Sequence, residues 1–195
     1  MQTPPDSCGG ASDEALLTRF AAGDAAAAQA LTERLTPRVY RHALRLLGGD
    51  GAEAEDVAQD AMLRLWRAAS GWRPGEARVT TWLYRVVANL CFDRHRKARM
   101  VALGDIDEPC DTRAGAVPRI VARQRADALQ AALDALPARQ RQAVVLRHIE
   151  GLGNPEIARV MDISVEAVES LTARGRKALG VALAGRRAEL GFEDD

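Results

Sequence analysis

The sequence has few aromatic residues and few cysteines, and each shortage excludes several protein classes. Aromatic residues make up 4% of the 195 residues, although 47% of the chain is hydrophobic. Ala and Leu, which are strong helix formers, supply much of that apolar content, whereas the β-branched and aromatic residues that favour strands are sparse. The composition therefore predicts an all-α fold, and we expect two small cores rather than one large core.

The three cysteines give no sign of a metal site or of a disulfide framework. Cys8, Cys91 and Cys110 form no Cys-x-x-Cys pair, and their spacing to the three histidines matches no common zinc pattern. We therefore expect no metal and no cofactor. So few cysteines, odd in number, fit a reducing cytoplasm. No apolar run approaches the roughly 20 residues that span a bilayer, and a signal peptide is not evident, so we expect a cytoplasmic protein without membrane contact.

The chain also has no net charge, because 27 basic residues balance 27 acidic ones. A neutral chain is not an obvious nucleic-acid binder. The two signs are nevertheless separated along the sequence. The stretch from Asp50 to Asp60 holds five acidic residues and no Lys or Arg, whereas the stretch from Thr80 to Arg99 holds five basic residues and one acidic residue. This separation predicts two different partners, one basic and one anionic.

The turn-forming residues and the spacing of the apolar ones divide the chain into two helical domains. We predict a disordered leader over residues 1–11, a helical domain over 12–100, a flexible linker over 101–118 and a second helical domain over 119–195. The linker is predicted because acidic residues, Gly and Pro occur there without a helical period. The expected helices cover residues 12–22, 25–47, 52–69, 80–99, 119–136, 137–149, 156–161 and 165 to beyond 179.

Polar residues and prolines mark where these helices begin. The expected N-cap residues are Ser12 or Asp13, Asp24, Thr80 or Thr81, Asn154 and Ser164. Pro137 suits the first turn of a helix, whereas Pro37 is expected to kink or split the helix in which it lies.

The helix predicted over 52–69 has two distinct faces. One is an apolar stripe that is expected in the core: Val57, Ala58, Ala61, Met62, Leu65 and Trp66. An adjacent face carries Asp56, Gln59, Asp60 and Leu63 at helical spacing. In the helix predicted over 80–99, Leu83, Val86, Val87 and Leu90 form the buried face, and Trp82 is expected beside them. Another face of that helix carries Arg85, Asn89, Phe92 and Arg96.

Residues 154–179 have the spacing of a helix-turn-helix. Ile157 and Val160 are expected to point into the domain, Ala158 is small where two helices approach, and Ile163 fills the turn. The outer face of the second helix would carry Glu166, Ser170, Arg174 and Lys177, with Arg176 beside them. Such a helix fits a major groove of about 12 Å, where Arg and Lys neutralise phosphates or reach guanine. Taken alone, the same pattern also fits an amphipathic hairpin that binds protein.

Three motifs in a fixed order resemble the extracytoplasmic-function (ECF, group IV) sigma factors of the sigma-70 family. AEDVAQDAMLRLWRAA resembles the helix that binds polymerase, and TTWLYRVVANLCFDRHRK resembles the helix that reads and melts the promoter. LPARQRQAVVLRHIEGL followed by PEIARVMDISVEAVESL resembles the DNA-binding domain. The departures from the family pattern are Asp162 where Gly is frequent, Gly153-Asn154 at the helix start, and Glu169, Leu171 and Thr172. The last three leave the promoter preference open.

The resemblance implies a sigma factor that directs core RNA polymerase to specific promoters and aids promoter melting. Residues 12–100 would dock on the polymerase clamp and bind the −10 element, and residues 119–195 would bind the −35 element and dock on the flap. An anti-sigma factor is an expected partner. The expected clamp contacts are Asp56, Gln59, Asp60 and Leu63. The expected −10 contacts are Arg73, Thr80, Arg85, Asn89, Arg94, Arg96 and Lys97. The expected −35 contacts are Ser164, Glu166, Ser170, Arg174, Arg176 and Lys177.

Two other functions remain alternatives at this point. A one-component helix-turn-helix regulator would explain residues 154–179 but not the two motifs of the first domain, and specific DNA binding without polymerase would distinguish it. The pair Asp56 and Asp60 could in principle bind a metal, but it lacks His partners and a facing carboxylate pair. We therefore expect no catalytic activity.

Overall fold

The computed structural model describes residues 11–73, 75, 77–102 and 118–184, and within these ranges the chain forms helices and turns but no strand. This confirms the predicted all-α fold. The helices of the first half are α1 (Asp13–Ala21), α2 (Ala25–Leu46), α3 (Gly51–Ala68), the 3-10 turn η1 (Ala69–Gly71) and α4 (Val79–Ala102). Those of the second half are α5 (Pro118–Asp134), α6 (Ala138–Val144), the π-helical turn η2 (Val145–Ile149), α7 (Asn154–Met161) and α8 (Val165–Ala184). The predicted leader, apart from Ala11, and residues 103–117 of the predicted linker lie outside the described residues.

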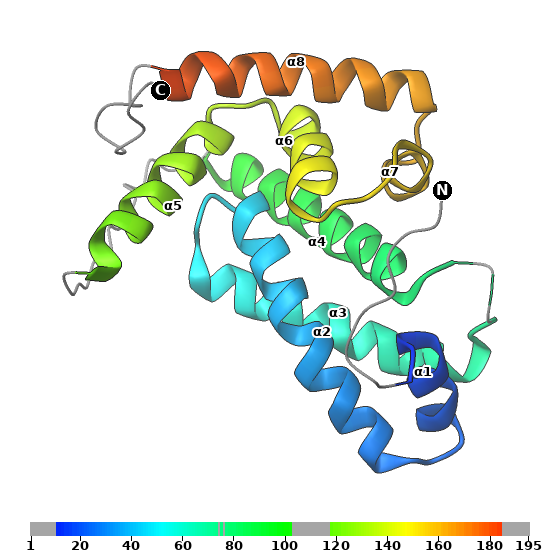
Figure 1. Cartoon of the computed structure of the whole chain (residues 1–195). Coiled ribbons are helices and arrows are strands. Elements are labelled where there is room, and N and C mark those ends of the chain that lie inside the picture. Colours follow the sequence, from blue (N-terminus) through cyan, green and yellow to red (C-terminus); the bar gives the residue numbers. More distant parts are fainter. Residues whose placement is uncertain (1–10, 74, 76, 103–117, 185–195) are drawn as a thin grey trace.

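Helices α1 to α4 pack into one bundle, the N-terminal domain (Figure 1). The apolar stripe predicted on α3 lies in its core, where Val57, Ala61 and Leu65 are completely buried. Helix α2 runs unbroken through Pro37, so the prediction that the proline could split the helix was wrong. The buried Leu35 and Val39 hold the helix on both sides of the proline, and their packing outweighs the backbone hydrogen bond that Pro removes.

Polar side chains accept hydrogen bonds from the first backbone N–H groups of the helices in this domain. Some of these side chains are neighbours in sequence, and others come from a different helix. The Oδ1 atom of Asp24 accepts hydrogen bonds from the N–H groups of Ala26 and Ala27, as predicted. Helix α4, however, begins at Val79, and its first N–H donates to the Glu14 carboxylate of α1 at 3.0 Å. The predicted Thr cap was therefore wrong, because the capping group comes from a distant helix.

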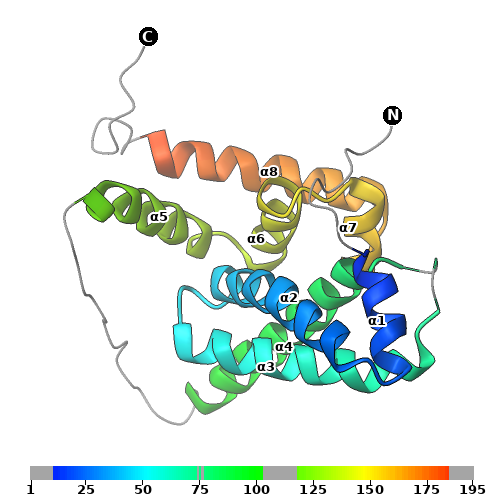
Figure 2. The same ribbon diagram turned by 60° about the horizontal axis from the view of Figure 1, so that its bottom comes forward.

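Helices α6, α7 and α8 form the C-terminal domain, with α5 lying against α8 (Figure 2). The turn between α7 and α8 has the predicted helix-turn-helix geometry. Asp162 adopts the left-handed conformation (φ 54°) that ends α7, and the Oγ atom of Ser164 accepts a hydrogen bond from the Ala167 N–H at the start of α8.

Two predicted helix starts in this domain were wrong by one residue. Gly153, rather than Asn154, is the N-cap of α7, and its N–H donates to the Glu156 carboxylate at 3.1 Å. The Glu156 side chain thus reaches back to the backbone of the N-cap residue, as the glutamate of a capping box does. Pro137 is the N-cap of α6 rather than a member of its first turn.

A single glycine sets the distance between α6 and α8. A Cβ atom placed on Gly175 would lie 2.5 Å from Cγ2 of Val144 and 3.3 Å from the carbonyl oxygen of Gln140. Only a residue without a side chain allows α8 to approach α6 this closely. The C-terminal domain therefore positions its exposed helix α8 through a backbone contact.

Candidate nucleic-acid and polymerase interfaces

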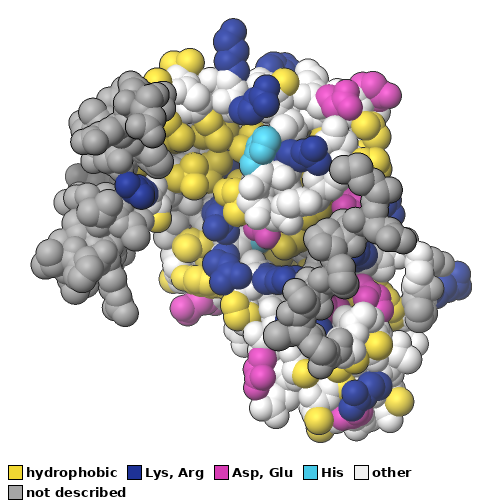
Figure 3. Space-filling model, viewed as in Figure 1, with side chains coloured by type: hydrophobic (Ala, Val, Ile, Leu, Met, Phe, Trp, Pro, Cys, Tyr) yellow, Lys and Arg dark blue, Asp and Glu magenta, His cyan; other side chains and the backbone are white. Residues whose placement is uncertain are grey.

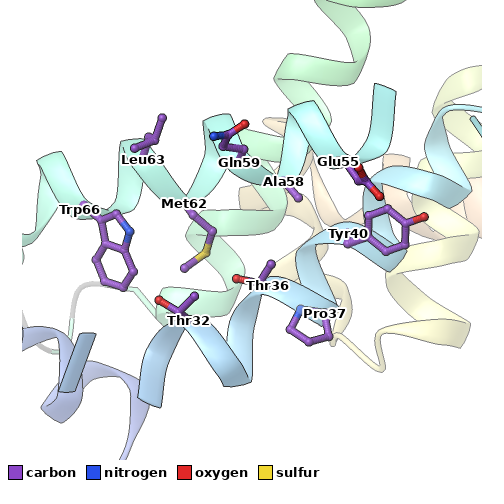
Figure 4. Close-up of a pocket in the computed structure, with 10 residues that line it drawn as sticks. All are labelled: Thr32, Thr36, Pro37, Tyr40, Glu55, Ala58, Gln59, Met62, Leu63 and Trp66. Carbon is purple, nitrogen blue, oxygen red and sulfur yellow. The ribbon is translucent and has the colours of Figure 1, made fainter. Parts of the chain in front are cut away.

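An apolar groove of about 500 Å³ opens between α2 and α3. It is lined by Thr32, Thr36, Pro37 and Tyr40 of α2 and by Glu55, Ala58, Gln59, Met62, Leu63 and Trp66 of α3. The side chains of Leu63 and Gln59 lie along its α3 edge (Figure 4), and Leu63 is 43% exposed. Large apolar side chains exposed beside a groove mark a surface for a partner. Two of the four predicted clamp contacts, Gln59 and Leu63, thus share one site.

The other two predicted clamp contacts face α4. Asp60 lies 3.5 Å and Asp56 lies 3.9 Å from the guanidinium nitrogens of Arg94, whose Nη1 atom also donates to the Glu53 carboxylate. Half or more of each aspartate side chain remains exposed. Asp56 and Asp60 therefore form an acidic edge beside the groove, and they join α3 to α4 at the same time. Arg94, a predicted DNA contact, is engaged by these acids.

The predicted −10 residues are spread over α4 and the loop that precedes it. Arg85, Asn89 and Arg96 are exposed on one face of α4, together with Phe92, which is 57% exposed. Arg96 also pairs with Asp93 at 3.2 Å. Arg73 is exposed in the loop and Thr80 is half-buried, whereas the side chain of Lys97 lies outside the described residues. Trp82 is half-buried against the core, with its ring edge-on to Trp72.

The predicted −35 residues lie together along the exposed face of α8 or at its start. Acidic side chains gather where α8 begins and basic ones lie farther along it (Figure 3). Arg174 donates to the Ser170 hydroxyl at 3.0 Å, which orders both side chains. A hydrogen bond from the backbone N–H of Glu166, followed by one from Ser164, lowers the pKa of the Glu166 carboxyl below its ordinary value. The start of α8 therefore carries negative charge at Glu166, ahead of Arg174, Arg176 and Lys177.

A buried polar cluster joins the two domains, and the sequence analysis missed it. The Oη atom of Tyr84 in α4 donates to Oε2 of Glu150 at 2.6 Å, and Nδ1 of His42 in α2 lies 3.4 Å from Oε1. These residues are far apart in sequence, so no local pattern connects them. The available signal was His42 itself, a titratable residue in the apolar row of α2 that also contains Leu35 and Val39.

The chain matches two sigma-factor families and several complete sigma factors. Residues 31–100 match Sigma-70 region 2 and residues 126–179 match Sigma-70, region 4. The ECF RNA polymerase sigma factor SigM of Mycobacterium tuberculosis is 35% identical over 86% of this chain and 83% of its own length. This chain belongs to the ECF sigma factors. SigW of Bacillus subtilis is 30% identical over 80% of this sigma factor and 89% of its own chain.

Solved structures of similar proteins have the same fold. CnrH in complex with the cytosolic domain of CnrY superposes with a TM-score of 0.64 and 27% identity over 89% of this sigma factor and 97% of CnrH. The sigma factor RpoE of Bartonella quintana, solved with the anti-sigma factor NepR, has a TM-score of 0.66 at 22% identity, over 80% of this chain and 96% of its own. The second similarity supports the fold.

Membership of this family decides between the functions left open by the sequence. The protein is an alternative sigma factor that directs core RNA polymerase to promoters, and the match to Sigma-70 region 2 argues against a one-component regulator. Sigma factors are not catalytic. Among the described residues, no group of His, Cys, Asp and Glu could hold a metal ion, and no helix is long and apolar enough to cross a membrane.

Cys91 lies on α4, the helix that carries most of the predicted −10 residues, but its thiol is shielded from solvent. Its side chain is 2% exposed, and burial raises the pKa of the thiol to about 12. The thiolate is the reactive form of cysteine. Cys91 therefore remains a protonated core residue at neutral pH.

Proposed function

We propose that this sigma factor binds the polymerase clamp through the α2–α3 groove and its acidic edge, the −10 element through α4, and the −35 element through α8. The second domain would also dock on the polymerase flap. The observation that carries the proposal is the groove, because it combines exposed Leu63 with Gln59 and lies beside Asp56 and Asp60.

The groove fits a helical partner with an apolar face and a basic rim. Amphipathic helices commonly bind by laying their apolar side into such a groove. Met62, Leu63 and Trp66 offer the apolar contact, whereas Asp56 and Asp60 offer charge at the edge. Charge complementarity at an edge of this kind steers encounter and orients the partner.

The −10 surface is best supported at Arg85, Asn89 and Arg96. These side chains are exposed on one face of α4, and Arg73 is exposed in the loop that precedes this helix. Melting a promoter requires capture of an unstacked base, because a stacked base presents no free face. Arg85 and Arg96 would hold the backbone while Asn89 bonds a base. Thr80 and Lys97 would extend this surface, and Arg94 would support it by holding α3 and α4 together.

The −35 surface combines charge neutralisation with direct reading of base edges. Arg174, Arg176 and Lys177 are exposed on α8 and suit phosphate or guanine contacts. Glu166, held as a carboxylate, suits the amino group of cytosine. Ser164 and Ser170 lie at the start of the same face and would contact the backbone.

An anti-sigma factor is also proposed as a partner, and the cytoplasm as the site of action. The supporting observation is the similarity to CnrH, which was solved in complex with the cytosolic domain of CnrY. Binding of purified candidate anti-sigma domains to this chain, with loss of transcription on binding, would test the partner.

Run-off transcription with bacterial core polymerase on a promoter library tests the function. We expect promoter-specific transcripts from the wild type, and at least a tenfold loss with Leu63→Glu, which places a charge in the groove. Asp60→Arg should also lose transcripts, although it disturbs the contact with Arg94 as well. Ala26→Glu is the control, since Ala26 is an exposed alanine at the far end of α2.

Two outcomes would contradict the proposal. If Leu63→Glu and Ala26→Glu transcribe equally, the groove is not the clamp contact. If the wild type gives no specific transcript but binds a DNA sequence specifically by itself, the protein acts as a conventional helix-turn-helix regulator.

A further inference from the structure

One exposed carboxylate of α8 is absent from the −35 contacts proposed above. Glu169 is exposed, and it lies three residues after Glu166 and directly before Ser170. Residues three or four apart share one face of a helix, so Glu166, Glu169 and Ser170 lie on the same outer face. Acidic side chains gather at this start of α8, whereas basic ones lie farther along the helix (Figure 3). A duplex that binds along α8 therefore meets the carboxylate of Glu169 as well as the basic residues.

Asn154 orients this carboxylate from the other helix of the helix-turn-helix. Asn154 is the first residue of α7, and its Nδ2 atom donates to Oε1 of Glu169 at 3.3 Å. Within the described part of the chain no other group bonds this carboxylate, so its Oε2 atom is available to a ligand. A glutamate side chain loses conformational freedom when a contact orders it. Because Asn154 orders Glu169 before any ligand binds, the carboxylate is preorganised for recognition.

The major groove of DNA offers few partners to a carboxylate. A carboxylate has hydrogen-bond acceptors alone. At the major-groove edge, cytosine presents an amino donor without an acceptor, adenine presents an acceptor beside its amino group, and guanine and thymine present acceptors. The carboxylate of Glu169 would therefore accept a hydrogen bond from cytosine, whereas guanine or thymine would leave its lone pairs unpaired. Unpaired polar groups at an interface weaken binding, so the same side chain attracts one base and rejects others.

The basic residues of α8 supply the affinity that a carboxylate lowers. Arg174, Arg176 and Lys177 are exposed, and at about 1.5 Å per residue they lie roughly 8–12 Å farther along the helix than Glu169. Contacts with phosphates position a protein on the duplex but do not identify its sequence. A carboxylate close to phosphates, by contrast, weakens binding to every sequence through repulsion. The basic part of α8 thus suits binding of the duplex, and its acidic start suits discrimination between sequences.

Glu166 and Glu169 are far enough apart to meet different base pairs. They are separated by three residues, which is roughly 4.5 Å along the helix axis. This distance exceeds the spacing of roughly 3.4 Å between base pairs. A change at Glu169 should therefore alter the preference at one position of the −35 element and leave the position next to Glu166 unchanged.

We infer that Glu169, oriented by Asn154, is a specificity-determining residue that selects cytosine at one position of the −35 element. The inference rests on the proposed function, because it requires α8 to lie in the major groove of that element. It adds the base that is selected and the residue that selects it. Asn154 is a positioning residue, since it acts through Glu169 and needs no contact with DNA of its own.

The test compares the base preferences of holoenzymes that contain variants of the full chain. Core polymerase is combined with the wild type, Glu169→Gln or Asn154→Ala, and it transcribes a promoter library with a fixed −10 element and a randomised −35 element. Each promoter carries a barcode in its transcribed region, so sequencing of the transcripts gives the activity of every −35 sequence. Asp127→Asn is the matched control, since it removes one exposed acidic charge from α5 of the same domain.

Glu169→Gln replaces the carboxylate by an amide of the same shape. Glutamine binds adenine through two hydrogen bonds, so we expect the preference for cytosine at one −35 position to fall about fivefold or more, with adenine becoming the preferred base there. Loss of the negative charge should also tighten binding of the holoenzyme to duplex DNA without a promoter by roughly twofold to threefold in a fluorescence titration.

Asn154→Ala keeps the charge of Glu169 and removes only its orientation. The preference for cytosine at the same position should fall roughly twofold to threefold, while binding to DNA without a promoter stays unchanged. The hydrogen bond between the Gly153 N–H and Glu156 at the start of α7 does not involve the Asn154 side chain. A purely structural role of Asn154 would not change the preference at a single position.

Two results would overturn the inference. One is a set of base preferences for Glu169→Gln that equals the set for Asp127→Asn. The other is an equal gain in activity on all −35 sequences, which would mean that Glu169 acts through its charge alone. If Glu169→Gln failed to fold, as judged by circular dichroism, Asn154→Ala would decide by the same comparison. Failure of the proposed function is distinct, because the wild type itself would then show no base preference at any −35 position.

Discussion

The two domains differ in how completely each can form its own core. Among the residues whose side chains the structure describes, the N-terminal domain has one continuous cluster of 21 buried residues that runs through all four of its helices. Counted in the same way, the C-terminal domain has two separate clusters of eight and four buried residues, and one of the eight is Tyr84 from the other domain. The smaller domain thus depends on its contact with the N-terminal domain for part of its core, whereas the larger domain forms its core from its own helices.

This difference follows from size, and it matches the roles of the domains. A small domain buries a smaller share of its apolar surface and is correspondingly marginal. The face of α8 that carries the proposed −35 contacts also lies outside the core, and α8 contributes only Val168 and Gly175 to the buried residues. Because α8 buries so little of its surface, the C-terminal domain gains stability from its contact with Tyr84 of the N-terminal domain.

The largest expected effect comes from one leucine removed from each core. Leu146 and Leu65 are both completely buried, and replacement of such a residue by Ala costs about 2–5 kcal/mol. Since a core of this small size rarely supplies more than about 3–5 kcal/mol, we expect Leu146→Ala to unfold the C-terminal domain. Leu65→Ala should lower the stability of the N-terminal domain and leave it folded.

Two spectroscopic signals separate the domains in this experiment. All three tryptophans, Trp66, Trp72 and Trp82, lie in the N-terminal domain, so urea unfolding followed by tryptophan fluorescence reports that domain, whereas circular dichroism reports both. Leu146→Ala should lose helix signal without urea while the fluorescence midpoint stays near that of the wild type. A common loss of both signals would mean that the domains fold as one unit.

An intermediate effect is expected where α8 crosses α6. Gly175→Ala would place a methyl group against Val144, and overpacking of this kind costs about 1–3 kcal/mol. Gly180→Ala is the matched control, because it lies in the same helix with open space around its Cβ position; there, Ala should stabilise by up to about 1 kcal/mol. Opposite shifts of the dichroism midpoint are therefore expected. If both variants shift the dichroism midpoint equally and in the same direction, α6 and α8 accommodate the added methyl group without loss of stability.

The sequence predicted those parts of the fold that depend on local patterns. The row Val57, Ala61 and Leu65 showed which side of α3 is buried, and Asp162 and Ser164 marked the turn before α8, because periodicity and capping act over a few residues. The start of α4 was missed, since Glu14 caps it from 65 residues away. No local rule describes a contact of that separation.

The site could be predicted as a set of faces but not as a set of contacts. The spacing of Gln59 and Leu63 placed them on one exposed face of α3, and the structure adds the groove that they share with α2. Arg94 was grouped with the DNA contacts because it lies in a basic run, whereas Glu53 and Asp60 engage it across two helices. Contacts between elements depend on how helices pack, which the spacing within one helix does not reveal.

The smallest expected effect is a dependence of the interdomain contact on pH. Burial raises the pKa of Glu150, but the hydrogen bonds and charge of His42, with Tyr84 and Arg45, outweigh it, so this pKa lies below its ordinary value. The folded protein therefore binds fewer protons at this site than the unfolded chain, and stability falls as pH falls. The contribution is fully present above the unfolded pKa of about 4.3 and is lost as pH drops through the folded pKa.

Glu150→Gln removes this titration and so isolates it. In urea unfolding followed by dichroism, the wild type should exceed Glu150→Gln in stability at pH 7 and pH 5, and the difference should shrink progressively below about pH 4.3. Glu33→Gln, an exposed change on α2, corrects for the loss of one charge. If the stability difference between the wild type and Glu150→Gln stays constant across the whole pH range, Glu150 acts through its shape and hydrogen bonds alone. The ionised carboxylate would then contribute nothing to the contact with Tyr84 and His42.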